Sequence, residues 1–401
     1  MAQPGLDRIE WAAGQMPVLA QVAERFAVER PLDGIRIAAC LHVTAETAVL
    51  AGVLCGGGAE FALCSANPLS AQDDVVAALR LDAGVEVHAR HGEAFEEYEA
   101  NVALLASGRP DVVLDDGGDL LIAATPRLGG TEETTAGLLR LRRLEGAGGL
   151  GFSVLAANEA RTERALNDRH GTGQSALDGI IRATNVLLAG HTVVVLGYGW
   201  AGLGVAERAR GAGAAVIVCE VDPLRALEAR MAGYEVMTSL EAASRGDVFI
   251  TVTGSRGVLR AEHFELMKDG ALLANAGHFD VEIDLPALRA LGVGKVRRLR
   301  PLVEQYELTD GRRLNLVASG RVVNLAAAEG HPAAVMDVSF ALQALCVEQL
   351  VLKPLTPGVH AVPEQIDREV GRLKLAALGV AIDEPTAEQD EYRRVWSTPN
   401  S

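Results

Sequence analysis

The stretch TVVVLGYGWAGLG, residues 192–204, decides the fold of this chain. An apolar run is followed by glycines in the spacing G-x-G-x-x-G, at Gly197, Gly199 and Gly202. In such a motif the first glycine permits a tight turn and the second lets the backbone approach a pyrophosphate. The third lets the helix pack closely against the strand. The motif therefore predicts a strand, a phosphate-binding turn and a helix over 205–210.

A carboxylate downstream indicates which dinucleotide binds. Glu220 ends the next predicted strand, where a carboxylate accepts hydrogen bonds from the hydroxyls of an adenosine ribose. Glu220 and Asp222 would repel a 2′-phosphate, so NAD is favoured over NADP. A glycine turn alone can be purely structural. The combination of strand, turn, helix and carboxylate is what predicts bound NAD.

Alternating strands and helices extend in both directions from this motif. Upstream we expect a helical region over 1–30 and strands at 35–40, 59–64, 85–89 and 112–114. Segments rich in glycine and acids are expected to separate this region from one long helical stretch, 158–188. Downstream we expect strands at 215–220, 234–237, 248–253 and 271–274, and a long helix at 333–350. The alternation predicts an α/β protein with two doubly wound parallel sheets.

Composition restricts the classes of function. The 401 residues suffice for two or three domains, and 49% hydrophobic with 22% charged residues is a globular composition. A formal net charge of −16 repels a phosphate backbone, so no nucleic acid partner is expected. Five scattered cysteines predict neither a disulfide framework nor a metal site. Without a signal-peptide pattern or a membrane-spanning apolar run, we expect a cytoplasmic protein that binds no membrane.

A series of motifs, all in family order, resembles the adenosylhomocysteinase (S-adenosyl-L-homocysteine hydrolase) family. The motifs are CLHVTAET (40–47), NPLSAQD (67–73), LDDGGD (114–119), TEETT (131–135), DGIIRAT (178–184), NAGHFDVEID (275–284), VNL (323–325) and GHP (330–332). Each has an ordinary structural explanation when taken singly, such as a solvated turn for the acidic one. Their joint occurrence over about residues 5–365 is far more specific.

The resemblance implies both a domain arrangement and a reaction. A substrate domain, 1–175 plus 335–365, would be interrupted by a Rossmann NAD domain, 176–334. Residues 366–401 would form a short C-terminal segment that lacks the usual tail of the family. The protein would be a homo-oligomer, a dimer or a tetramer. Its NAD would oxidise the 3′-hydroxyl of a nucleoside sugar, and a base would then remove the 4′ proton. The 5′ substituent leaves, water adds, and the ketone is reduced again.

The same resemblance assigns roles to residues. Acid–base groups around the 4′ and 5′ positions would be His42, Asp116 and His278, and the ribose hydroxyls would be bound by Glu133 and Thr134. The adenine or the sugar would be held by Leu41, Thr44, Glu46, Asp168, Leu325, His331 and Met336. Beside the three glycines of the loop, NAD would be contacted by Thr135, Glu220, Thr253, Asn275 and Asn324.

One segment departs from the family. The family carries a lysine four residues before an Asp-Asn pair, and these groups engage the 2′ and 3′ hydroxyls and help hydride transfer. Here Glu163 replaces the lysine, and Asn167-Asp168 replaces the pair. A carboxylate beside Glu133 would raise one pKa, so Glu163 would be protonated or act as a base itself. Arg164, one residue on, cannot serve as a base because arginine stays protonated. A solvated surface helix is the alternative explanation for both.

Three functions are therefore open at this stage. The first is a variant that oxidises an adenine nucleoside and eliminates from it, for example a nucleoside dehydration. The second is hydrolysis of S-adenosylhomocysteine to adenosine and homocysteine. The third is a non-catalytic regulator that binds NAD or a nucleoside. The lost lysine favours the first and the third, whereas the matching acid–base groups favour an enzyme. We expect the first.

Overall fold

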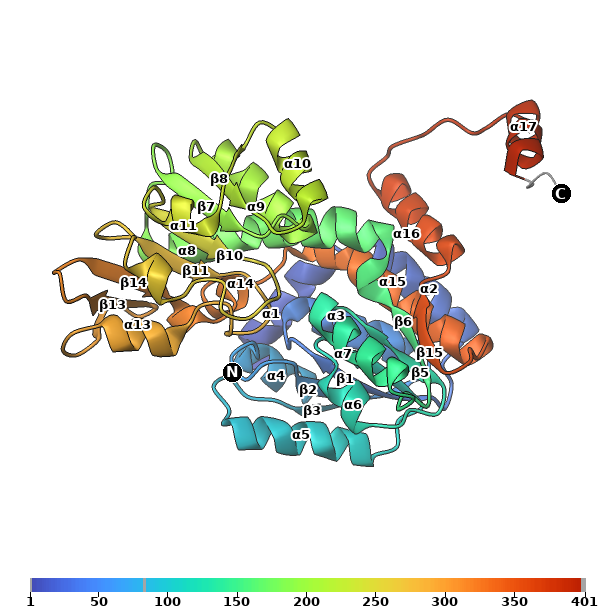
Figure 1. The fold of residues 1–401 in the computed structure, drawn as a ribbon. Helices are drawn as coiled ribbons and strands as arrows, with labels where there is room; N and C mark the ends of the chain where they lie inside the picture. The colour runs from blue at the N-terminus through green and yellow to red at the C-terminus, as the bar shows by residue number, and fades with distance from the viewer. Residues whose placement is uncertain (1, 82–83, 398–401) are drawn as a thin grey trace.

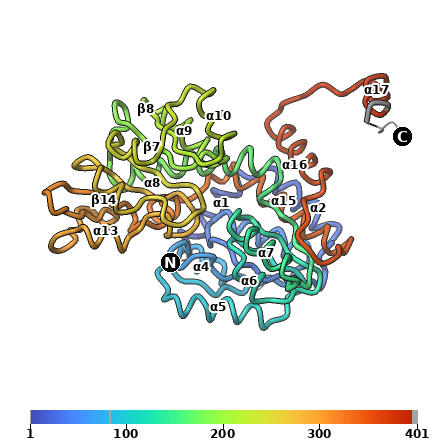
Figure 2. The backbone as a smooth tube through the Cα atoms, in the orientation of Figure 1, coloured from blue at the N-terminus to red at the C-terminus, as the bar shows by residue number. Residues whose placement is uncertain are grey.

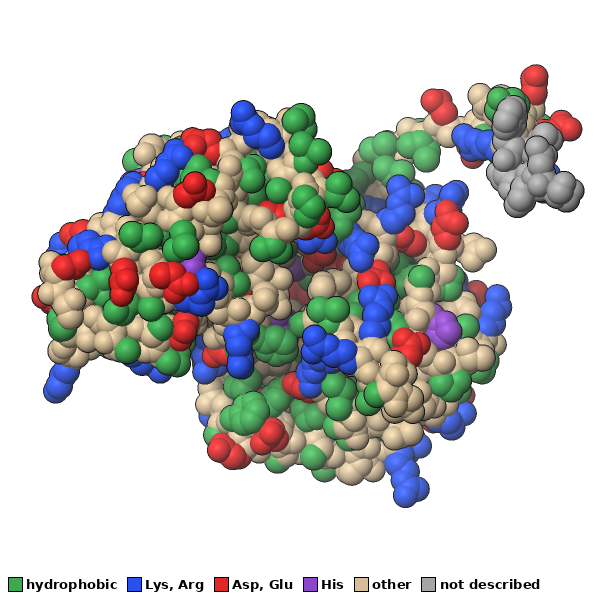
Figure 3. All heavy atoms as spheres, viewed as in Figure 1, with side chains coloured by type: hydrophobic (Ala, Val, Ile, Leu, Met, Phe, Trp, Pro, Cys, Tyr) green, Lys and Arg blue, Asp and Glu red, His purple; other side chains and the backbone are tan. Residues whose placement is uncertain are grey.

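The computed structural model describes residues 2–81 and 84–397. The chain forms two α/β lobes (Figure 1), and the space-filling view shows a hollow between them (Figure 3). The first lobe is built on a wholly parallel sheet in the order β15-β6-β5-β4-β1-β2-β3. Its strands are β1 Arg36–Leu41, β2 Glu60–Ser65, β3 Val85–His88, β4 Val112–Asp115, β5 Gly129–Glu132, β6 Ser153–Ala156 and β15 Gly358–Ala361.

Helices cover both faces of the first sheet. One face packs against α1 Ala2–Ala13, α2 Pro17–Glu29, α3 Ala45–Gly56, α4 Asp73–Leu79 and α15 Ala333–Leu352. The other packs against α5 Phe95–Ser107, α6 Asp119–Ala123 and α7 Thr135–Gly146. Helix α15 is long and apolar enough to cross a membrane, but most of it is buried in this core. Its hydrophobicity is thus that of a core helix.

The second lobe holds a sheet in the order β12-β13-β14-β11-β10-β7-β8-β9. Its strands are β7 Thr192–Leu196, β8 Ala215–Cys219, β9 Glu235–Val236, β10 Val248–Thr251, β11 Leu272–Asn275, β12 Arg297–Arg300, β13 Val303–Glu307 and β14 Arg313–Val317. The six neighbouring strands β9-β8-β7-β10-β11-β14 of this sheet follow the order 3-2-1-4-5-6 of the dinucleotide-binding fold. The predicted Rossmann domain, inserted in another parallel-sheet domain, is confirmed because β15 returns to the first sheet.

Short helices complete the second lobe and the C-terminal region. The second lobe contains α9 Trp200–Gly211, α10 Pro223–Met231, α11 Ser239–Ala243, α12 Ala261–Phe264, α13 Leu285–Leu291, the 3₁₀ turn η3 Ala318–Gly320 and α14 Val323–Ala326. After β15 come α16 Glu364–Ala377 and α17 Ala387–Ser397. The last of these projects away from both lobes (Figure 2). The exact domain limits and the missing tail stay predictions.

The predicted helical stretch over 158–188 is confirmed in its main part, since residues 161–184 are helical without interruption, but three elements occupy the region in place of one uniform helix. They are a 3₁₀ turn η1 Ala157–Glu159, a π-helix η2 Glu163–Thr172 and an α-helix α8 Gly173–Thr184. The π-helix lies against α9 at very short range. A Cβ added at Gly204 would fall 1.8 Å from the Arg169 carbonyl oxygen, so only glycine allows this approach. Wide π turns are frequent at functional sites.

Other departures have local causes. Residues 1–30 form two helices, because the chain breaks before Pro17. The segment 129–135, expected to separate the first α/β region from the helical stretch, contains the buried strand β5. Its sequence GGTE lacks an apolar signal, and its glycines are needed because a Cβ at Gly130 would meet the Val113 carbonyl oxygen at 2.5 Å. The antiparallel strands β12 and β13 were not predicted either.

Candidate active site

A cavity of about 1010 Å³ lies where the two lobes meet. The space-filling view shows the hollow between them, with acidic and histidine side chains at its bottom (Figure 3). All predicted site residues line this cavity except Gly202 and Asn275. The fold thus brings together residues from both ends of the chain, although their individual roles stay predictions.

The acid–base candidates follow the carboxyl ends of strands. His42 comes directly after β1 and Asp116 directly after β4, and the strand order of the first sheet reverses between these two strands. Ligands of doubly wound sheets bind at such a reversal. His278 follows β11 of the second lobe. The site is therefore completed only when both lobes are in place.

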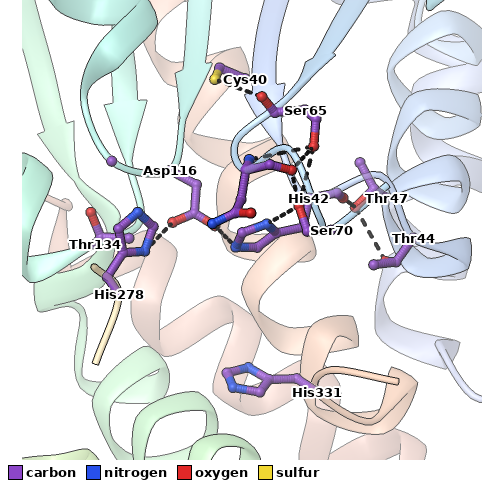
Figure 4. Close-up of polar contacts among 12 residues, drawn as sticks. Cys40, His42, Thr44, Thr47, Ser65, Ser70, Asp116, Thr134, His278 and His331 are labelled. Carbon is purple, nitrogen blue, oxygen red and sulfur yellow. Dashed lines mark hydrogen bonds and ion pairs between the residues drawn. The ribbon is translucent and has the colours of Figure 1, made fainter. Parts of the chain in front are cut away.

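Asp116 lies between the two histidines (Figure 4). Its Oδ2 is 3.2 Å from His42 Nε2, and its Oδ1 is 3.9 Å from His278 Nδ1. The ligand atoms of this trio lie within 4.8 Å of one another, a spacing that could also hold a metal ion. The expectation of no metal site rested on the cysteines and stays a prediction.

The surroundings of His42 define how it can exchange a proton. The Ser70 hydroxyl donates to the Asn67 carbonyl oxygen at 2.9 Å, so its oxygen is left to accept from His42 Nδ1 at 2.7 Å. Nε2 then faces Asp116 as the exchanging atom. Burial lowers the pKa of His42, and nearby His278 lowers it further, while Asp116 opposes both. The imidazole is therefore poised as a base near neutral pH.

Carboxyl groups gather on the side of the cavity lined by η2. Burial raises the pKa of Glu163 to about 8 and that of Asp168 to about 7. Burial, and after it Glu163, holds the pKa of Glu133 well above its usual range. Glu163 is only 3% exposed, which rules out the alternative of a solvated surface position. Asn167 is turned toward α15, where its Nδ2 donates to Ser339 Oγ at 2.6 Å.

A different wall carries the residues predicted to hold adenine. Thr44 and Glu46 stand at the beginning of α3, and Leu325 lies on α14. His331 Nε2 is 3.2 Å from Thr172 Oγ1, and burial lowers its pKa to about 4. A neutral imidazole and a hydroxyl suit an uncharged heterocycle. Thr172, on the π-helix, is a lining residue that the sequence motifs did not single out.

The glycine loop forms the cofactor half of the cavity. Gly197 has a φ of 105°, and a Cβ at Gly202 would lie 2.0 Å from the Gly197 carbonyl oxygen. The loop is therefore compatible only with glycine at these positions. Helix α9 begins at Trp200 with its N-terminus toward the cavity lining, an arrangement that favours a pyrophosphate. Glu220 receives the Tyr198 amide at 2.6 Å and thereby ties the loop to β8.

Two buried residues support this half from behind. Asn275 does not line the cavity; it accepts from the Gly277 amide and donates to the Phe279 carbonyl, and so it shapes the loop that carries His278. Glu282 accepts hydrogen bonds from the amides of Thr253 and Gly254. Glu282 was quoted within a motif but given no role, because the sequence does not tell which residues of a loop face inward.

The residues present fit NAD. The Asn324 Oδ1 atom is buried and has no hydrogen-bond partner within residues 2–81 and 84–397. Asn324, Thr253 and Thr135 line the cavity with the glycine loop. Such an unsatisfied acceptor at a dinucleotide loop needs a donor from a ligand. The fold, loop and carboxylate therefore supply phosphate, ribose and amide contacts from one connected surface.

Comparison with known proteins agrees with this geometry. A family model described as S-adenosyl-L-homocysteine hydrolase matches residues 1–128, and the model of its NAD binding domain matches residues 168–330. The adenosylhomocysteinase of Aquifex aeolicus is 55% identical over 99% of this chain and 97% of that protein. This chain belongs to the adenosylhomocysteinase family. Its cofactor is NAD, as the glycine loop predicted.

Further relatives cover nearly the same length. The adenosylhomocysteinase of Gloeobacter violaceus is 52% identical over 99% of this chain and 95% of that protein. A protein named S-inosyl-L-homocysteine hydrolase from Methanopyrus kandleri is 52% identical over 99% of this chain and 96% of that protein. The relatives thus include hydrolases named for two different purine bases.

Proposed function

We propose that this member of the family hydrolyses the thioether bond of S-adenosyl-L-homocysteine and releases adenosine and homocysteine. The observation that carries the proposal is Asp116 held between His42 and His278 at the junction of the lobes. Similarity to adenosylhomocysteinases over nearly the whole of both chains supports the same reaction. The dehydration that the sequence led us to expect receives no such support and becomes a second candidate.

The cofactor would be held at the glycine loop, with Glu220, Thr253 and Asn324 around it. Bound NAD supplies a hydride acceptor for the 3′-hydroxyl of the sugar and returns the hydride at the end of the turnover. The protein side chains therefore have to move only protons and to exclude bulk water. Enclosure between two lobes suits the second task.

Proton transfer would be shared by the three acid–base groups. Removal of the 4′ proton and loss of the 5′ sulfur as a thiol require one base and one acid on the same face of the sugar. His42 Nε2, with its lowered pKa, can take the proton, and His278 can give one to the departing sulfur. Asp116 would stabilise the imidazolium that forms when His42 takes the proton. Water then adds at the 5′ carbon, and the proton is returned to the 4′ carbon.

Glu163 would take the place of the family lysine at the sugar hydroxyls. It would accept the proton of the 3′-hydroxyl as hydride leaves the 3′ carbon. Its pKa of about 8 lies close to neutral pH, as an efficient base requires. Glu133 and Thr134 would bind the neighbouring hydroxyl, while the base would lie against Thr44, Glu46 and His331.

The second candidate is elimination of water from an adenine nucleoside. It shares the oxidation and the 4′ proton removal, but hydroxide leaves the 5′ position and takes up a proton to form water. The ketone is then reduced by the same hydride, and an unsaturated nucleoside is released. The observation in its favour is that Glu163 lines the cavity where the family has a lysine. A different residue beside the sugar suits a different substrate. Both candidates need the same acid–base trio. They differ in the group that departs.

Product analysis separates the candidates. The purified protein, loaded with NAD, is incubated with S-adenosyl-L-homocysteine, and free thiol is measured while nucleosides are identified by mass. We expect thiol and adenosine in equal amounts. Absence of thiol, together with loss of water from adenosine or another adenine nucleoside, would establish dehydration instead. If neither occurs and Asp116→Asn leaves nucleoside binding unchanged, a non-catalytic regulator takes their place.

A further inference from the structure

Four carboxyl groups surround the sugar end of the cavity. Glu133, Glu163, Asp116 and Asp168 all line it. Asp168 and Asp116 each raise the pKa of Glu163, and Glu163 in turn raises that of Glu133. Such repulsion operates only between groups that are close in space and poorly screened. This part of the cavity is therefore rich in hydrogen-bond acceptors.

Protein donors satisfy this cluster only in part. Hydrogen bonds from Ser339 and Asn167 oppose the rise in the pKa of Glu163. Glu163 Oε2 and Glu133 Oε1 are both fully shielded from solvent and have no hydrogen-bond partner within the described residues. The charge of Arg164 lowers the pKa of Asp168. The Arg164 side chain is, however, 38% exposed and forms an ion pair with Glu159 at 3.5 Å. A buried acceptor without a donor costs free energy, and a donor on a ligand removes that cost.

The chemistry of Glu163 is the reverse of the chemistry in the family motif. A lysine at this place donates hydrogen bonds to the sugar and adds a positive charge. A glutamate accepts hydrogen bonds at both oxygens when it is ionised, donates only one when it is protonated, and adds no positive charge. A ligand that complements the lysine presents acceptors here, so a ligand that complements Glu163 has to present a donor.

We propose that the sugar of the preferred substrate carries, beside the hydroxyl that is oxidised, one hydrogen-bond donor more than ribose has, and that this group contacts Glu163. The extra donor is an ammonium or a further hydroxyl. The inference rests on the proposed function for the position of the sugar in the cavity. It makes Glu163 a specificity-determining residue, which selects a donor-rich sugar over plain ribose.

Binding measurements test this inference directly. Dissociation constants are measured by calorimetry on the NAD-loaded protein for adenosine, for 2′-amino-2′-deoxyadenosine and for an adenosine with an additional hydroxymethyl group on its sugar. We expect at least one donor-rich nucleoside to bind about tenfold more tightly than adenosine, the gain of one charge-assisted hydrogen bond. Preference for the amino compound identifies an ammonium, and preference for the hydroxymethyl compound identifies a hydroxyl.

Variants assign that preference to Glu163. Glu163→Gln should abolish the preference, and the combined change Glu163→Lys, Asn167→Asp and Asp168→Asn, which restores the family pattern, should favour adenosine instead. Glu93→Gln is the matched control. Glu93 is 5% exposed, burial raises its pKa to about 7, and its Oε1 also lacks a partner, but it does not line the cavity. It should leave all three constants unchanged.

The outcomes separate this inference from the proposed function. Tighter or equal binding of adenosine by the unaltered protein overturns the inference, and so does a preference that survives in Glu163→Gln. Thiol release from S-adenosyl-L-homocysteine is measured on the same samples. Thiol release without a donor preference leaves the proposed function standing and removes the inference. A donor preference that depends on Glu163, without thiol release, supports the inference and removes the proposed function.

Discussion

Two pairs of glutamates, one at the cofactor half of the cavity and one at the sugar end, differ in their hydrogen-bond partners. Of the first pair, Glu220 lines the cavity and Glu282 is buried behind its wall. In the second lobe, both oxygens of Glu220 and of Glu282 receive backbone amides, from residues 198, 221 and 222 and from residues 253 and 254. At the sugar end, Glu163 and Glu133 each keep an oxygen that has no hydrogen-bond partner among the residues that the structure describes. The chemical group is the same in both places. What differs is whether the fold brings donors to it.

This difference distinguishes carboxylates that hold the protein together from carboxylates that await a ligand. Where backbone amides point at a carboxylate, its contacts are complete and it fixes a loop. Burial raises the pKa of Glu282 as well, but the amides of Thr253 and Gly254 oppose that rise. Where amides are missing, this opposition is missing too, and the group becomes able to exchange a proton or to bind a donor. Perturbed acids at a cavity are therefore candidates for chemistry, whereas satisfied ones are candidates for positioning.

The largest effect is expected at the acid–base trio, to which both halves of the cavity contribute. Asp116→Asn should lower kcat for thiol release by about a thousandfold, within the range of general acid–base catalysis, because neither histidine keeps its charged partner. Calorimetric binding of NAD should not change, since Asp116 lies on the first lobe. Retention of more than a tenth of the activity would contradict the role of Asp116.

The next effect concerns Glu163, one of the two sugar-end glutamates. Glu163→Gln should lower the rate of NAD reduction in a single turnover by about a hundredfold, a typical contribution of one base. In the unaltered protein that rate should rise with pH up to about 8, where Glu163 loses its proton. The variant should lack this rise. Absorbance of reduced NAD follows the step, and an unchanged pH profile would exclude Glu163 as the base.

A smaller effect is expected at Glu282, one of the two glutamates whose oxygens accept backbone amides. Glu282→Gln keeps the volume but turns a carboxylate that accepts three hydrogen bonds from Thr253 and Gly254 into an amide. Loss of charge assistance should weaken NAD binding by about tenfold. The chemistry after NAD has bound should stay within about threefold of normal. A large fall of the single-turnover rate at saturating NAD would show that Glu282 does more than position its loop.

The smallest effect is on stability and has a defined sign. The folded pKa of Glu163, about 8, lies above its ordinary value of 4.5, so the folded state binds the proton more tightly. The penalty of burying this group is absent below pH 4.5 and grows until about pH 8. Glu163→Gln should therefore gain stability over the unaltered protein as pH rises, by a few kcal/mol at most, given about 1.4 kcal/mol per pKa unit. Denaturant unfolding at pH 5 and pH 8.5 measures this gain; equal differences at both pH values would contradict it.

Local sequence predicted the elements whose signal is local. The strand, glycine turn and helix from 192 to 211 were predicted because an apolar run and the backbone demands of glycine are visible in a short window. Strand β5 was not predicted, since its burial between β4 and β6 leaves no room for apolar side chains at Gly129 and Gly130. The π-helix η2 was not predicted either; it packs against α9, a contact between segments that a short window of sequence does not reveal.

The sequence by itself determined the family, the NAD loop and the types of side chain available for catalysis. These follow from motif order and from the chemistry of each residue, which no fold can change. Only the tertiary structure decided that Asp116 stands between two histidines from different lobes and that Glu163 is buried without a full set of donors. The physical reason is that proximity, burial and the direction of backbone amides are set by contacts between distant segments, and these determine the pKa and the partners of each carboxyl group.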